Sequence, residues 1–170
     1  MISLANFDQA IIEKHGITER KLERVNRYVR LLQGDEAPTL RDIAVGGYYG
    51  TSALLHEVVE LDILLERDPR LLRRSPAEVQ RLFRANEDAH CRALSVEYGY
   101  LQRIIREFFG EEVSIGALIM ANASSRDFYA LVSSHEPLRL FKPDEPDENE
   151  VVRAALLLQR LRARGKEMLQ

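Results

Sequence analysis

The sequence contains a single cysteine, Cys91, and no apolar run long enough to cross a membrane. A single cysteine excludes an intrachain disulfide, which is typical of proteins in a reducing compartment. The first residues, "MISLANFDQAIIEKHG", include Asp8 and Glu13 and lack the basic start and apolar centre of a secretory signal. A membrane-spanning helix needs about 20 mostly apolar residues. We therefore expect a cytoplasmic protein that does not enter a membrane.

The sequence also lacks a large excess of charge of either sign. Its 170 residues carry a formal net charge of −3, and 45% of them are hydrophobic. This balance gives no overall attraction to nucleic acid or to an anionic membrane. The length is normal for one domain and is sufficient to bury a hydrophobic core without disulfides.

Helical periodicity dominates the first third of the chain. Between residues 18 and 32, apolar residues recur at a spacing that forms a one-sided stripe. Thr18 is suited to cap the start of this helix, and Gly34 to end it. Residues 34–52 include Gly46, Gly47 and Gly50, so we expect a loop or a bend, with one short extended piece over residues 43–49.

Two further helices are predicted in the middle of the chain. The first covers residues 53–67. The second begins after Ser75, which forms a capping box with Glu78 around a proline at the first helical position. Its periodicity continues over residues 76–109, which is long for a globular helix, and a kink is expected near Gly99.

The last part of the chain is more irregular. Residues 115–134 are expected to form one broken helix or two short ones, residues 135–150 an acidic, proline-containing arm, and residues 151–169 a final helix. The prediction is an all-α, single-domain bundle of five or six helices with one long central helix. Residues 1–142 would form the core domain. Residues 143–170 would form an acidic linker and a C-terminal helix, packed on the core or on a second subunit.

The long helix places polar residues where apolar ones are expected. At about 100° per residue, Asn86, His90 and Glu97 fall at the centre of its apolar stripe, and Glu87 falls at the flank. An unpaired buried carboxylate costs several kcal/mol. These side chains should therefore satisfy one another or hold a ligand.

The helix over residues 53–67 offers the partner groups. It is apolar almost all round, which is typical of a buried helix. His56 and Glu60 are four residues apart and share a face, while Glu57 lies within the apolar arc. Histidine and glutamate side chains from two facing helices are a common way to build a metal site in a bundle.

We therefore predict a metal site between these two helices. The predicted ligands are His56, Glu60, Glu87, His90 and Glu97. Mixed imidazole and carboxylate ligands suit zinc, manganese, iron or nickel better than calcium. Glu57 is the predicted catalytic base, because a metal ion and a carboxylate together activate water for hydrolysis. Metal binding without catalysis stays open, and the sequence does not indicate whether a substrate would be a small molecule or a peptide.

Three short motifs resemble known metal-binding families. "HEVVE" resembles the His-Glu-x-x-His motif of zinc peptidases, with Glu60 in place of the second histidine, and that resemblance implies a general-base role for Glu57. "EDAH", ending at His90, resembles the Glu-x-x-His motif of di-iron bundles. Glu57 and Glu60 also resemble the paired acids of magnesium-binding all-α nucleotide pyrophosphatases. Each resemblance covers fewer than ten residues, so no family is assigned.

Two other interpretations remain. The buried polar residues could form a hydrogen-bonded network in a non-enzymatic interaction module, which would be a homodimer. The long helix also has an arginine face, whose members are Arg81, Arg84, Arg92, Arg103 and Arg106. Such a face can contact phosphates. The net charge instead favours a solvated face paired with neighbouring acids, and nucleic acid is not an expected partner.

Overall fold

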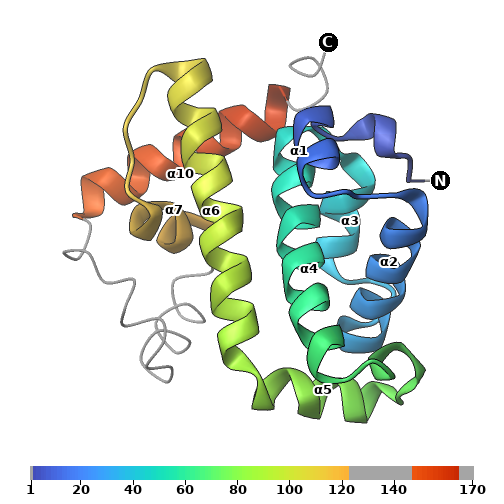
Figure 1. The fold of residues 1–170 in the computed structure, drawn as a ribbon. Coiled ribbons are helices and arrows are strands. Elements are labelled where there is room, and N and C mark those ends of the chain that lie inside the picture. The colour runs from blue at the N-terminus through green and yellow to red at the C-terminus, as the bar shows by residue number, and fades with distance from the viewer. Residues whose placement is uncertain (1, 123–146, 165–170) are drawn as a thin grey trace.

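The computed structural model describes residues 2–122 and 147–164 of the chain, and within them the regular structure is entirely helical (Figure 1). The eight α-helices in this part of the chain confirm the predicted all-α class and slightly exceed the predicted number of helices. Their bounds are α1 Gln9–Lys14, α2 Glu19–Gln33, α3 Pro38–Val45, α4 Gly47–Arg67, α5 Pro76–Ala85, α6 Glu87–Phe109, α7 Ile115–Asn122 and α10 Glu148–Arg164. Two 3-10 turns, η1 Leu4–Asn6 and η2 Leu71–Arg73, complete them. None of these helices has the length and apolar character that crossing a membrane requires.

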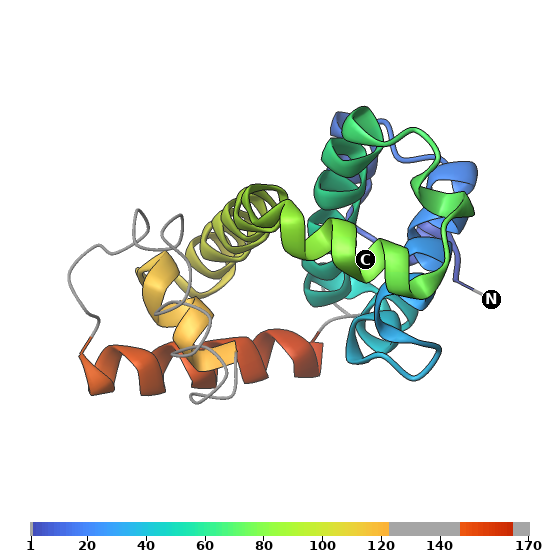
Figure 2. The same cartoon turned by 90° about the horizontal axis from the view of Figure 1, so that it is seen from below.

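Helix α4 is the long central element of the fold. It lies beside α6 along most of its length, with α2 and α3 against its other side (Figure 1). Helices α7 and α10 lie together next to α6, on the side away from α2 and α3 (Figure 2). Helix α10 also contacts α4. The central helix therefore has neighbours on opposite sides.

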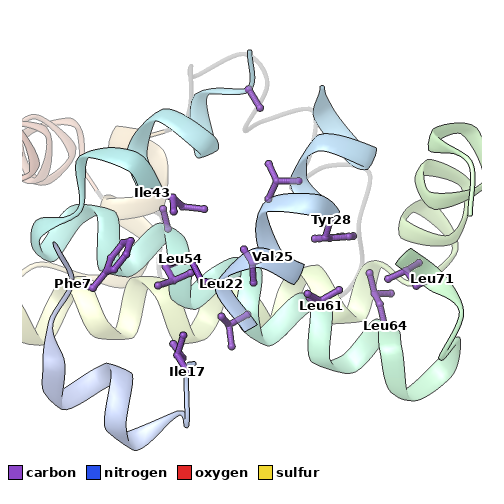
Figure 3. Close-up of a cluster of buried hydrophobic side chains, with 14 of the residues drawn as sticks. Phe7, Ile17, Leu22, Val25, Tyr28, Ile43, Leu54, Leu61, Leu64 and Leu71 are labelled. Carbon is purple, nitrogen blue, oxygen red and sulfur yellow. The ribbon is translucent and has the colours of Figure 1, made fainter. Parts of the chain in front are cut away.

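Two hydrophobic clusters stabilise this arrangement, and α4 contributes to both. Leu54 and Leu61 pack with Tyr28 of α2 in the first cluster, which Figure 3 shows in close-up. Leu55 packs with Leu101 of α6 in the second cluster, which also includes residues of α7 and α10. Each of these side chains is no more than 1% exposed. The central position of α4 explains why its sequence is apolar almost all round.

Most of the predicted helix ends are confirmed. The Thr18 hydroxyl accepts a hydrogen bond from the Lys21 amide at 3.2 Å, and Ser75 with Glu78 forms the predicted capping box. Gly110 ends α6 in the left-handed conformation, with φ of 65°. These signals are local, so the sequence reports them directly.

The prediction of a loop over residues 34–52 is wrong. Helix α3 occupies part of that segment, and α4 begins at Gly47. No strand is found in the part of the chain that the structure describes, so the predicted extended piece is also wrong. The glycines serve the packing instead. Gly46 has a φ of 71° and ends α3, and a Cβ at Gly50 would lie 2.6 Å from the Asp42 carbonyl oxygen. The missing side chain at Gly50 allows α3 and α4 to approach closely.

The prediction of one unbroken helix over residues 76–109 is also wrong. Asn86 has φ of −128° and ψ of 47°, and it separates α5 from α6. Its Nδ2 donates to the Leu82 carbonyl oxygen at 2.6 Å. Asparagine side chains compete in this way for backbone groups that would otherwise continue a helix. Helix α6 runs through Gly99, the expected kink position, as one element.

Other predictions fall partly beyond the described residues. Helix α7 lies within the segment predicted to be helical after residue 115, but residues 123–146 lie outside the description, including most of the expected arm and the boundary at residue 142. The final helix begins at Glu148, so the prediction of an irregular arm is wrong for residues 148–150. The reason is a local cap, in which the Glu150 amide donates to Asp147 Oδ1 at 2.7 Å. The division into a core domain and a C-terminal unit stays a prediction.

The close approach of α3 and α4 can be tested with two alanine substitutions. Alanine exceeds glycine in helix propensity by about 1 kcal/mol. Gly99→Ala should therefore raise the free energy of unfolding, because nothing lies within 4 Å of its added Cβ. Gly50→Ala should lower the free energy of unfolding by about 1–3 kcal/mol, because its Cβ meets backbone that cannot easily move. Urea denaturation measures both. Equal stabilisation by both substitutions would contradict the close packing.

Candidate metal centre

Helix α4 carries three titratable side chains into the protein interior within little more than one turn. His56, Glu57 and Glu60 are 8%, 3% and 1% exposed. Because the helix is covered on opposite sides, these groups have little access to bulk water. Their polar atoms must therefore be satisfied by side chains of neighbouring helices or by a ligand.

The Glu60 carboxylate receives groups from three helices. Its Oε1 accepts a hydrogen bond from the Tyr28 hydroxyl of α2 at 2.5 Å. Its Oε2 lies 2.7 Å from Nδ1 of His90 on α6. The same Oε2 is 3.4 Å from Nε2 of His56, one turn earlier on α4. Glu60 is thus the point at which α2, α4 and α6 meet through polar contacts.

The orientation of His56 is fixed by Glu97 of α6. Nδ1 of His56 lies 2.8 Å from Oε2 of Glu97. An ionised carboxylate only accepts hydrogen bonds, so Nδ1 carries the proton and donates it to Glu97. Nε2 is then directed towards Glu60. This is the arrangement in which a metal-binding histidine donates its other ring nitrogen to a carboxylate.

The geometry of His56, Glu60 and His90 is close to that of a three-ligand metal site. One potential ligand atom from each lies within 4.8 Å of the other two. At zinc–ligand distances of about 2.0–2.2 Å and tetrahedral angles, ligand atoms lie roughly 3.4 Å apart. The separation of His56 Nε2 and Glu60 Oε2 is 3.4 Å. The shorter contact between Glu60 and His90 would have to open by several tenths of an ångström.

The same contacts set the charge of the site. Burial opposes ionisation of Glu60, but hydrogen bonds from His56 and His90 outweigh it and lower its pKa to about 2. Burial also opposes a charge on His56, yet hydrogen bonds to Glu60 and Glu97 raise its pKa well above its ordinary value. Without a metal, the site therefore holds a carboxylate and an imidazolium in contact.

Glu57 differs sharply from Glu60. Its Oε2 is buried and has no hydrogen-bond partner among the residues that the structure describes. Burial, reinforced by the charges of Glu60 and Glu97, raises its pKa to about 8, against an opposing effect of His56. Glu57 lines a cavity of about 200 Å³. The cavity is lined by Gln33, Thr39, Asp42, Tyr49, Ala53, His56, Glu57, His90, Glu97, Tyr98 and Asn122.

The structure brings some of the predicted ligands together and separates others. His56, Glu60 and His90 form the three-residue group. Glu97 contacts Nδ1 of His56, whereas Nε2 of His56 is the ring nitrogen that faces Glu60. Glu87 is half-buried and is not a member of this group in the described part of the chain. Whether any of the five binds metal stays a prediction.

Two residues need a different interpretation from the one that the helical stripe suggests. Asn86 does not join the polar group, because it forms the break between α5 and α6, and its Oδ1 accepts from Arg67 at 2.8 Å. Tyr28 was not predicted as part of the site. It lies beside Val25 and Val29 in the apolar stripe of α2, where an aromatic residue indicates core packing. The only signal was its hydroxyl, which needs a partner when buried.

Two arginines of α6, and Arg67 at the end of α4, pair with nearby acids. Arg103 lies 3.3 Å from Glu107, and Arg106 pairs with Glu112. Arg67 makes two hydrogen bonds to Asp88. These contacts fit the interpretation of a solvated, acid-paired face.

Comparison with known proteins finds no matching family model, no matching curated protein and no matching solved structure.

The unusual state of Glu57 makes a prediction about metal-free protein. A carboxyl group whose folded pKa is raised stabilises the fold fully below its unfolded pKa, near 4.5, and this contribution is lost as pH rises through about 8. Glu57→Gln should therefore match the wild type at pH 4.5 and exceed its free energy of unfolding at pH 8.5 by at least about 1 kcal/mol, the equivalent of one pKa unit.

Urea denaturation in the presence of a chelator measures this difference at both pH values. Glu107→Gln is the matched control, since Glu107 is exposed and paired with Arg103. Parallel stability curves for the wild type and Glu57→Gln would contradict a buried, protonated Glu57.

Proposed function

We propose that this protein binds one divalent transition metal ion through His56, Glu60 and His90, and that the metal site catalyses hydrolysis. The observation that carries the proposal is the convergence of their three ligand atoms within 4.8 Å of one another. Two imidazoles and a carboxylate are a recurrent ligand set of catalytic zinc and of non-haem iron. The proposal keeps zinc, manganese, iron and nickel as the metals to be tested.

The contacts around the three ligands support this assignment. Glu97 accepts from Nδ1 of His56 and leaves Nε2 for a metal. Tyr28 donates to Oε1 of Glu60 and leaves Oε2 directed at the two imidazoles. Such contacts orient metal ligands and tune their basicity. A metal would replace the protons now shared between Glu60 and the histidines, so its binding should release protons.

Glu57 is the proposed general base. It shares the cavity with His56 and His90, and one of its oxygens has no partner among the described residues. His90 is 24% exposed, so solvent can reach the edge of the site. A metal ion lowers the pKa of bound water to about 7 in hydrolytic enzymes. A free carboxylate beside that water can then accept its proton.

A second candidate function rests on the same contacts. Both oxygens of Glu60 already have partners, Tyr28 on one and His90 on the other, without any metal. A satisfied buried network of this kind can specify a unique packing of helices. The protein would then be a non-enzymatic interaction module. That it forms a homodimer, and that it acts in the cytoplasm, stay predictions.

Metal content separates the two functions. Protein prepared without a histidine tag and titrated with zinc, manganese, iron(II) or nickel should bind one ion per chain, as measured by calorimetry and elemental analysis. His56→Ala and His90→Ala should each lose stoichiometric binding, because each removes a ligand. His15→Ala is the control, since His15 lies outside the three-residue group.

Bound metal should also raise the melting temperature of the wild type, because a ligand that binds only the folded state stabilises it. The absence of both binding and a thermal shift for all four metals would refute the metal site and favour the network. Metal binding that persists in His56→Ala and His90→Ala would place the ion elsewhere.

The orienting contacts make a separate prediction. Glu97→Gln and Tyr28→Phe should each bind the metal about 10–100-fold more weakly, with one ion still bound per chain, because they disturb the ligands without removing them. Tyr100→Phe is the matched control, since its hydroxyl contacts Asp8 at 2.9 Å and borders no part of the cavity. An unchanged affinity in both variants would show that Glu97 and Tyr28 do not act on the ligands.

A further inference from the structure

A second polar group borders the cavity, separate from the proposed metal ligands. It is a chain of hydrogen bonds that links four helices: Arg162 of α10, Tyr49 of α4, Asn122 of α7 and Tyr98 of α6. Tyr49 and Tyr98 are 7% and 4% exposed. Tyr49, Tyr98 and Asn122 all line the cavity that His56, Glu57 and His90 also line.

Arg162, the first residue in this series of hydrogen bonds, determines which group donates in each of them. A guanidinium group can only donate. Arg162 lies 2.5 Å from the Tyr49 hydroxyl oxygen and 3.3 Å from Oδ1 of Asn122, so both oxygens accept. The Tyr49 hydroxyl then donates its own proton to the same Oδ1 at 2.5 Å.

The orientation of the Asn122 amide determines whether the Tyr98 hydroxyl donates or accepts. With Oδ1 directed at Arg162, Nδ2 of Asn122 faces Tyr98 and donates to its hydroxyl oxygen at 2.7 Å. The proton of the Tyr98 hydroxyl is therefore not used in the chain. No group in the described ranges accepts it. Among the described residues, the series of hydrogen bonds therefore ends at the Tyr98 hydroxyl, which keeps one free donor on a residue that lines the cavity.

The charge around the cavity restricts what this donor can bind. The acids Asp42, Glu57 and Glu97 line it together with His56, whose positive charge is already paired with Glu60 and Glu97. An anionic ligand would therefore be repelled by those acids that are ionised, without a free cation among the described lining residues to hold it. Arg162 is already engaged: its guanidinium stacks 4.1 Å from the centre of the Tyr49 ring and is not part of the cavity lining. The free donor therefore favours an acceptor oxygen that carries no full charge.

We propose that the Tyr98 hydroxyl donates a hydrogen bond to the carbonyl oxygen of a small, uncharged amide or ester bound in this cavity. The assignment of an amide or ester as the substrate class rests on the metal-dependent hydrolysis proposed above. The carbonyl site itself rests only on the hydrogen-bond chain and the cavity. The cavity volume of about 200 Å³ limits the bound part to a small group.

The donor has a defined task in such a reaction. Water forms a bond to the carbonyl carbon while Glu57 takes its proton, and the electron pair of the C=O π bond moves onto the oxygen. Tyr98 stabilises the negative charge that develops there. The electron pair on the oxygen then re-forms the C=O bond while the bond to the amine or alcohol breaks, and the leaving group takes that bond's electron pair and the proton from Glu57. The products are a carboxylic acid and an amine or alcohol.

The carbonyl site can be tested with acetamide, the simplest uncharged ligand of this class. Acetamide is titrated into full-length, metal-free protein, and amide resonances of cavity residues are followed by NMR. A saturable shift is expected. Tyr98→Phe should weaken the binding about two- to tenfold, the range for one hydrogen bond. Tyr100→Phe, two residues further along α6, should leave it unchanged.

A second variant tests the direction of the chain without removing Tyr98. Asn122→Asp replaces a donor by an acceptor of the same size, next to Arg162. The Tyr98 hydroxyl would then donate to the new carboxylate, and its proton would no longer be available to the cavity. Acetamide binding should weaken as in Tyr98→Phe. The pairing with Arg162 should preserve folding, which thermal unfolding verifies.

Zinc titration of the same proteins separates this inference from the proposed function. The inference is wrong, and the metal site stands, if zinc binds but acetamide does not. The same holds if zinc binds and acetamide has equal affinity for the wild type, Tyr98→Phe and Asn122→Asp. If zinc does not bind but acetamide affinity depends on both residues, the carbonyl site stands without the metal chemistry. Tighter binding of acetate than of acetamide would overturn the preference for an uncharged carbonyl.

Discussion

The fold depends on one buried carboxylate and the three groups that satisfy it. Glu60 is 1% exposed, and an ion in that position costs several kcal/mol unless donors surround it. Tyr28, His56 and His90 supply those donors from α2, α4 and α6. Removing a single donor would leave the buried carboxylate incompletely satisfied and would destabilise this arrangement. The three helices are therefore held in one relative arrangement by a polar contact, whereas their apolar surfaces alone would tolerate small shifts.

This constraint explains features that lie far from the polar group. Helix α4 must stay central, since both of its flanks contribute to the hydrophobic clusters while one strip carries His56 and Glu60. Gly50 allows α3 to approach the start of α4, and a side chain there would meet the Asp42 carbonyl. Asn86 turns the chain between α5 and α6 one turn before His90. The break gives α6 its own axis alongside α4, so that His90 reaches Glu60.

The sequence predicted those parts of the structure that depend on local signals. The caps at Thr18 and Ser75 are encoded within one helical turn. The direction of His90 towards α4 follows from the apolar stripe of its own helix. The helices within residues 34–52 were missed because glycine indicates a turn locally, whereas here it serves contact between helices. Of the site, the histidine and glutamate positions could be read from the two helices. The roles of Tyr28 and Glu97 could not, because they depend on which atom of a neighbour each one meets.

The two buried carboxyl groups of α4, Glu57 and Glu60, have opposite chemical properties although they lie within one helical turn. Glu60 has three donors, so it is ionised and suited to hold a cation, while Glu57 has none for its Oε2 and retains its proton up to about pH 8. A divalent ion held beside His56 would add positive charge near Glu57 and stabilise its ionised form. Metal binding would thereby convert Glu57 from a buried acid into a base at neutral pH. In the proposed enzyme, the base would be active only when the metal that activates water is also present.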